Sequence, residues 1–184
     1  MSLALIKLLL LVSILLVLGN RPVAVCVEEA TSAAQNGTGS AEQLHSAPGF
    51  ALSDLQNRRH KAADFGNNIV VLDFWATWCA PCIEEIPLFN QLQETHRAQG
   101  LKVIGLAVQS GWPKDIKRFL SKHKMRYTIL VGNDDIVADF DVISLPTTFL
   151  IAPGWRVYKK YTGAYEGKAA DIERDVKELL SQKQ

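Results

Sequence analysis

The chain has 184 residues, of which 48% are hydrophobic, and a formal net charge of +1 at pH 7. This size and apolar content are sufficient for one globular domain with a sizeable core, together with additional terminal segments. The near-neutral charge, without a cluster of basic residues, argues against nucleic acid as a partner.

The N-terminal segment Leu3–Leu18 is almost wholly apolar and is interrupted only by Lys7 and Ser13. At about 16 residues it is short for a membrane-spanning helix and long for the core of a signal peptide. We expect residues 1–25 to be a signal peptide or a membrane anchor. The protein would then act outside the cytoplasm, in the periplasm or at the outer face of the cytoplasmic membrane. Cleavage of this segment and lipidation of Cys26 stay open.

The following segment, from Glu28 to Ala47, has hardly an apolar residue larger than alanine. Such a composition cannot bury enough apolar surface to offset the entropy cost of ordering the chain. We therefore expect a flexible linker over residues 26–46 and one globular domain over residues 47–184.

Strand and helix patterns alternate along the globular part. Central strands are predicted at Ile69–Trp75 and Leu101–Val108, because both are continuous apolar runs. The other predicted elements are a weak edge hairpin at Asp54–Asp64, strands at Tyr127–Val131, Thr147–Ile151 and Val157–Tyr161, and helices at Pro81–Gln99, Pro113–His123, Asp135–Phe140 and around Ile172–Leu180. This order predicts an α/β fold in which helices cover both faces of a mixed central sheet.

Cys79 and Cys82 are separated by two residues at the junction of the first central strand and its helix. The positive end of the helix dipole favours a thiolate at this place. A second thiol one turn later can attack a mixed disulfide formed by the first, so the pair is a two-electron switch that needs no cofactor. We assign no metal, because the scattered histidines and Cys26 do not supply a second pair of zinc ligands. A structural disulfide over so short a loop would constrain the unfolded chain little.

The position of each group suggests its role. Cys79, at the start of the helix, is expected to be the more exposed nucleophile, and Cys82 the resolving thiol. Asp73 lies within a buried-strand pattern, where an acid is costly unless it is neutral or hydrogen-bonded. It is interpreted as a carboxyl with a raised pKa that accepts a proton from Cys82. The structural alternative is an acid at the strand end that reaches solvent.

Around this pair the sequence resembles thioredoxin-fold proteins. The resemblance lies in Asp73–Ala76, in Trp78–Cys82, in Pro87 within the following helix, and in Leu145–Phe149, which is similar to the family's cis-proline loop. More narrowly, the chain resembles the TlpA/ResA-like thiol-disulfide oxidoreductases. The features shared with that branch are the apolar N-terminus, Ala47–Phe50 before an extra hairpin, a helix after the second central strand, and Glu85 before Ile86 and Pro87.

The resemblance implies a thioredoxin-like fold over residues 47–184, with an extra N-terminal β-hairpin and an inserted helix. It implies a cis-Pro146 that offers a backbone edge to a substrate strand beside Cys79. Leu145 and the apolar surface around Trp78 would select the substrate. Glu85 would lie near the thiols and tune their titration, or else be a solvated acid in the first turns of its helix.

The expected function is that of an exported, membrane-tethered enzyme, a monomer, acting on the thiols and disulfides of proteins. The resemblance favours reduction, for example of the haem-attachment cysteines of apocytochrome c, with electrons from a membrane donor. An oxidant of protein thiols is the alternative, and a non-enzymatic copper-delivery or partner-binding module stays open because copper(I) prefers sulfur ligands. A thiol peroxidase is disfavoured, since Ala76 stands where that class has threonine.

Overall fold

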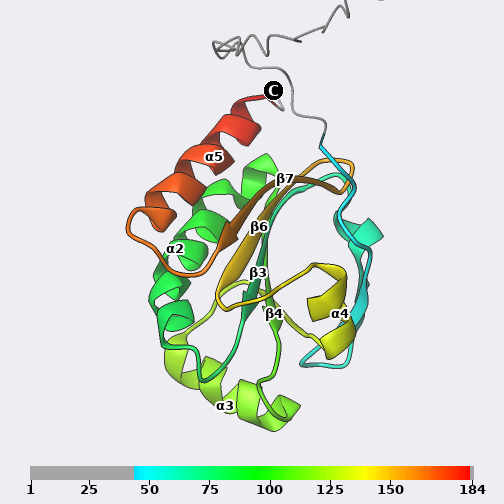
Figure 1. Ribbon diagram of the computed structural model, residues 1–184, viewed down its shortest axis with the longest axis vertical. Helices are drawn as coiled ribbons and strands as arrows, with labels where there is room; N and C mark the ends of the chain where they lie inside the picture. Colours follow the sequence, from blue (N-terminus) through cyan, green and yellow to red (C-terminus); the bar gives the residue numbers. More distant parts are fainter. Residues whose placement is uncertain (1–43, 183–184) are drawn as a thin grey trace, which may run out of the picture. The chain divides into compact units, whose positions relative to one another are not determined.

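The computed structural model of the protein describes residues 44–182 (Figure 1). The predicted signal peptide or anchor and most of the predicted linker lie outside these residues. The last three residues of that linker contact the domain: the His45 carbonyl accepts a hydrogen bond from the Val157 N–H at 2.9 Å, and Ser46 forms a β-bridge with Arg156. Within residues 44–182, no helix has the length and apolarity to cross a membrane.

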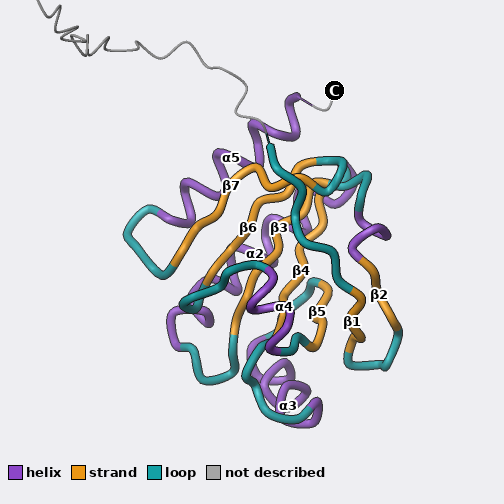
Figure 2. The backbone as a smooth tube through the Cα atoms, turned by 45° about the vertical axis from the view of Figure 1, so that its right-hand side comes forward, coloured by secondary structure: helices purple, strands orange, loops and turns teal. Residues whose placement is uncertain are grey.

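Seven strands of the described chain form one mixed sheet in the order β2-β1-β5-β4-β3-β6-β7. Their bounds are β1 Ala51–Asp54, β2 Arg59–Lys61, β3 Ile69–Trp75, β4 Leu101–Ala107, β5 Thr128–Val131, β6 Thr147–Ala152 and β7 Arg156–Thr162. β3, β4 and β5 are parallel, whereas β6 and β7 on one side and β1 and β2 on the other pair antiparallel. Figure 2 shows the β1–β2 hairpin beside β5. The predicted mixed sheet and the extra edge hairpin are confirmed.

Helices cover both faces of the sheet, as predicted. Their bounds are α2 Ala80–His96, α3 Pro113–His123, α4 Asp134–Asp139 and α5 Lys168–Gln182, with short 3-10 helices at Ala62–Phe65 and Arg97–Gln99. One core cluster contains buried residues of α2, α3 and α5, and the other contains those of α4 and the first 3-10 helix. In Figure 1, α2 and α5 accordingly lie on one side of the sheet and α4 on the other. The helix expected after the second central strand is α3.

Strand β3 is buried along its whole length and divides its side chains between the two cores. Ile69, Val71 and Trp75 face α2, because side chains alternate along a strand. Val70, Leu72 and Phe74 face α4. Asp73 has the same parity as Val71 and Trp75. The strand therefore places one acid on the face that α2 covers.

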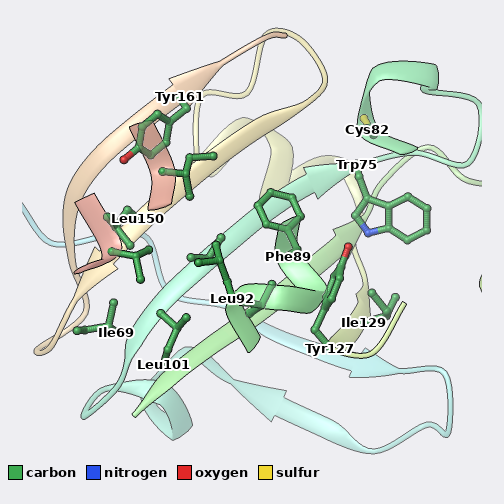
Figure 3. Packing of buried hydrophobic residues seen from close by; sticks show 14 of the residues in the cluster. Ile69, Trp75, Cys82, Phe89, Leu92, Leu101, Tyr127, Ile129, Leu150 and Tyr161 are labelled. Carbon is green, nitrogen blue, oxygen red and sulfur yellow. The ribbon is translucent and has the colours of Figure 1, made fainter. Parts of the chain in front are cut away.

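Helix α2 follows the short loop 76–79. Cys79 occupies its N-cap position in an extended conformation, with φ −85° and ψ 98°, and Pro81 fits the first turn. Phe89 and Leu92 anchor it: they are fully buried among residues of β3, β4 and β6 (Figure 3). The helix ends at His96, and the remainder of the predicted helix is the 3-10 turn that closes at Gly100 with φ 91°. These anchors hold the start of α2 at the end of β3.

Candidate active site

Cys79 and Cys82 form a disulfide, with an S–S distance of 2.01 Å. Cys79 is the residue before the first turn of α2, and Cys82 lies in that turn. The side chains are 4% and 3% exposed. Both cysteines belong to the core cluster that α2 covers, and their exposed fractions differ too little to distinguish them in the disulfide form, so the greater exposure of Cys79 stays a prediction.

The loop before the cysteines is held by the loop after β4. The Trp78 indole Nε1 donates a hydrogen bond to the Gln109 carbonyl at 2.9 Å, and the Thr77 N–H donates to the Ser110 Oγ at 3.1 Å. The Ser110 hydroxyl in turn donates to the Val108 carbonyl at 2.9 Å. Trp78 is exposed, so its ring lies at the rim of the site.

Pro146 lies opposite the end of β3 and follows a cis peptide bond after Leu145, as the resemblance implied. The register pairs Phe74 with Thr147, which places the Leu145–Pro146 segment level with the end of β3 and the start of the cysteine loop. Pro146 is buried and Leu145 is half-buried. The Pro146 carbonyl accepts a hydrogen bond from the Gly163 N–H at 2.8 Å, which ties this segment to the loop before α5.

Asp73 is 1% exposed, so the alternative of an acid that reaches solvent is wrong. Its Oδ1 accepts a hydrogen bond at 3.0 Å from the hydroxyl of Thr148, the residue paired with it on β6. Burial, and secondarily the charge of Glu85, raise the pKa of Asp73 from its ordinary 3.8 to about 7, while Lys168 and Thr148 oppose the shift. The carboxyl can therefore both take up and release a proton near neutral pH.

Glu85 is also drawn into the interior, and the alternative of a solvated helix acid is wrong. Its side chain is 14% exposed, and its Oε1 forms an ion pair with the Lys168 Nζ at 2.7 Å. Burial raises the pKa of Glu85 above its ordinary 4.5, and the Lys168 ammonium opposes this rise. Glu85 follows Cys82 by three residues on α2, so the two side chains are neighbours on one helix face.

Lys168, which the sequence analysis did not single out, is the first residue of α5 and only 3% exposed. A lysine at a helix start normally indicates a surface position. The available signal was its spacing: it precedes the buried Ile172 by four residues and Val176 by eight, and so belongs to the apolar stripe of α5.

A buried phenol completes the group. Tyr127, next to β5, is buried, and its burial first and then the charges of Asp73 and Glu85 raise the pKa of its phenol. Within the described chain its hydroxyl has no hydrogen-bond partner, and neither has the second carboxylate oxygen of Glu85. We call Asp73, Glu85, Tyr127 and Lys168 the polar cluster.

The structure thus brings the predicted residues to one end of β3. The disulfide lies at the start of α2, next to Trp78 and level with the Leu145–Pro146 segment. Asp73 lies on the sheet face that α2 covers, and Glu85 lies on α2 itself. Such an arrangement supports exchange of two electrons between two thiols and a partner disulfide, with a titratable carboxyl to take the proton.

Comparisons with known proteins agree with this chemistry. Residues 44–160 match the AhpC/TSA family. The thiol-disulfide oxidoreductase ResA of Geobacillus thermodenitrificans is 40% identical over 119 residues, which cover 64% of this chain and 67% of that protein. The ResA of Geobacillus kaustophilus is 36% identical over 135 residues, 72% of this chain and 75% of that protein.

The likeness extends to solved structures. A Chlorobium tepidum protein described as thiol:disulfide interchange protein DsbE has a TM-score of 0.71 and 27% identity, with 77% of this chain and 99% of that chain covered. Fold, cysteine pair and sequence likeness lead to one conclusion. The chain belongs to the AhpC/TSA family and, within it, to the ResA-like thiol-disulfide oxidoreductases of the thioredoxin fold.

Proposed function

We propose that this chain is an exported, membrane-tethered enzyme that reduces disulfide bonds in proteins outside the cytoplasm. The observation that carries the proposal is the Cys79–Cys82 disulfide at the start of α2, together with the buried Asp73 on the sheet face that α2 covers and the half-buried Glu85 on α2 itself. The cysteine pair holds two electrons in its dithiol form. The pKa of Asp73, raised to about 7, suits a carboxyl that exchanges a proton near neutral pH.

The reaction follows from these positions. The Cys79 thiolate attacks one sulfur of the substrate disulfide, and the other substrate sulfur leaves as a thiolate. The Cys82 thiol then gives its proton to the Asp73 carboxylate and attacks the Cys79 sulfur of the mixed disulfide. The Cys79–Cys82 bond forms, and the bond to the substrate breaks. The substrate leaves with two more electrons, and Asp73 keeps the proton until it is released.

The polar cluster favours reduction over oxidation. Strong oxidants of this kind owe their potential to a stabilised reduced thiolate. Here Glu85 follows Cys82 by three residues on α2, and its carboxyl forms an ion pair with Lys168 at 2.7 Å. Asp73 and Glu85 outnumber this single ammonium, so the group is negative when both acids are ionised. A negative charge next to a thiol disfavours the thiolate, which destabilises the reduced form and makes it the better electron donor.

Exposed apolar residues in the loops at this end of the sheet support a protein substrate. Within residues 44–182 the large exposed hydrophobic residues are Trp78, Trp112, Ile143 and Tyr165. Each lies in a different loop, and hydrogen bonds join these loops in pairs: Trp78 bonds the loop that leads to Trp112, and Pro146, in the Ile143 loop, bonds the loop that leads to Tyr165. An extended segment with apolar residues beside its cysteine fits such a rim, with Leu145 and Pro146 as its backbone contact.

The proposed location rests on the N-terminal sequence, and the proposed partners rest on the resemblance to the ResA-like branch. The apolar segment Leu3–Leu18 would carry the domain across a membrane and tether it there. A tethered reductant needs electrons from a membrane donor. The resemblance to the ResA-like branch supports the haem-attachment cysteines of apocytochrome c as one substrate.

The test is the reduction potential of the Cys79–Cys82 pair in the full chain, equilibrated in glutathione or dithiothreitol buffers. A value near or below about −230 mV, in the range of thioredoxins and glutaredoxins, is expected. A value nearer about −120 mV would make the protein a disulfide donor and overturn the proposed direction. Stoichiometric copper binding without disulfide exchange would instead indicate a copper-delivery module. Turnover of peroxide would indicate a thiol peroxidase.

A further inference from the structure

Lys168 lies in the interior of the protein, where an unpaired lysine is rarely found. Its side chain is 3% exposed, and apart from its ion pair with Glu85 its ammonium has no hydrogen-bond partner within the described chain. Burial of an ammonium group is costly unless a negative charge compensates it. The compensating negative charge therefore has to come from the acids that Lys168 faces.

The charges around Lys168 come from several elements and do not balance unless a proton is added. Strand β3 contributes Asp73, α2 contributes Glu85, and the chain before β5 contributes the neutral phenol of Tyr127. Strand β6 contributes a neutral hydroxyl, that of Thr148, and the cysteines next to the cluster are joined in a disulfide. Two carboxyls thus share one ammonium. The buried group is neutral only when one of the two acids carries a proton.

The distances show which acid is paired with the Lys168 ammonium. Glu85 Oε1 is 2.7 Å from the Lys168 Nζ, whereas Asp73 Oδ1 is 3.0 Å from the uncharged hydroxyl of Thr148. A close ammonium favours the ionised form of its partner, and a hydroxyl does so much less. Glu85 is therefore the acid that keeps its charge, and Asp73 is the acid that binds the proton.

We propose that Lys168 is a positioning residue that holds Glu85 ionised and thereby reserves Asp73 as the acid that exchanges a proton during the redox reaction. The role of Asp73 in that exchange rests on the proposed function. The charge arrangement itself does not, because it exists in the oxidised protein without a substrate. Without Lys168, two acids in one site would compete for the proton released by Cys82.

The experiment is a carboxyl titration of the full-length oxidised protein, followed by NMR with ¹³C-labelled Asp and Glu side chains. In the disulfide form Cys79 and Cys82 do not titrate, so the carboxyl signals are read alone. In the unmodified protein the Glu85 midpoint should lie below the Asp73 midpoint. In Lys168→Met the Glu85 midpoint should rise by about 1 to 3 pH units, the effect of losing a close opposite charge.

Matched variants separate the specific effect from a general one. Lys168→Arg keeps the charge and should restore the order of the two midpoints. Lys177→Met removes a Lys–Glu pair of the same 2.7 Å length, formed with Glu173 on the exposed side of α5, and should leave both midpoints unchanged. A Glu85 midpoint in Lys168→Met equal to that of the unmodified protein would overturn the proposal.

A second variant keeps the proposal testable if Lys168→Met does not fold. In Glu85→Gln the ammonium loses its partner and is left with Asp73, so the Asp73 midpoint should fall by about 1 to 3 pH units. An unchanged Asp73 midpoint would show that Lys168 does not act on these acids. These titrations can fail while the protein still reduces substrates, and they can succeed in a protein that reduces none, so the two proposals are separable.

Discussion

Replacement of Asp73 by asparagine should stabilise the oxidised protein at alkaline pH and leave its stability at acid pH nearly unchanged. The folded state raises the pKa of this carboxyl from 3.8 to about 7, so it retains a proton that the unfolded chain has already released. The contribution of Asp73 to stability is then fully present below about pH 4, declines as the pH rises towards 7, and stays lost above it. Asparagine does not ionise, and its amide oxygen can still accept the hydrogen bond of Thr148.

The magnitude follows from the size of the shift. About three pKa units, at about 1.4 kcal/mol per unit, correspond to about 4 kcal/mol between pH 4 and pH 8. Urea unfolding of the oxidised full chain at pH 4, 6 and 8 measures this as a widening difference between the two proteins. Asp141→Asn, which removes a carboxyl that is 90% exposed, is the control and should show no such widening. Parallel stability curves for Asp73→Asn and the unmodified protein would refute the burial argument.

Two further predictions concern the cysteines and the packing beside the polar cluster. Cys82→Ser should accumulate a mixed disulfide between Cys79 and its substrate, visible on a non-reducing gel and absent when Cys79 is also replaced; a missing adduct would count against Cys82 as the resolving thiol. Gly105→Ala should cost about 1 to 3 kcal/mol in denaturant unfolding, because its Cβ would lie 2.8 Å from the Trp75 Nε1. Gly49→Ala, with nothing within 4 Å of its Cβ, is the matched control, and equal losses in the two variants would contradict the steric explanation.

The parts of the fold that were predictable are those with a local cause. The continuous apolar run of β3 and the stripe on α2 require burial on particular faces, and Pro81 and Gly100 mark the two ends of the helical segment. Asp73 was recognisable for the same reason, since an acid within such a run has to be neutral or bonded. Local chemistry therefore gave the sheet, the helices and the cysteine pair.

The environment of Glu85 was not predictable, because it depends on a residue 83 positions later in the chain. A glutamate in the early turns of a helix is ordinarily solvated, and only the docking of α5 against α2 brings Lys168 onto it. The burial of the disulfide was not predictable for a related reason. The position of Cys79 at a helix start says nothing about the surrounding structure, which buries both cysteines. Tertiary contacts, rather than local pattern, determine the environments of Glu85 and of the disulfide.

The two edge strands of the sheet, β2 and β7, have features that disfavour pairing with another polypeptide. β2 has three residues, Arg59, His60 and Lys61, and β7 at the opposite edge carries Arg156, Lys159 and Lys160. Short strands and positive side chains discourage another polypeptide from adding itself to a sheet. If a substrate segment binds at the uncharged Leu145–Pro146 backbone, as proposed, these features of β2 and β7 reduce competing strand addition at the two edges of the sheet.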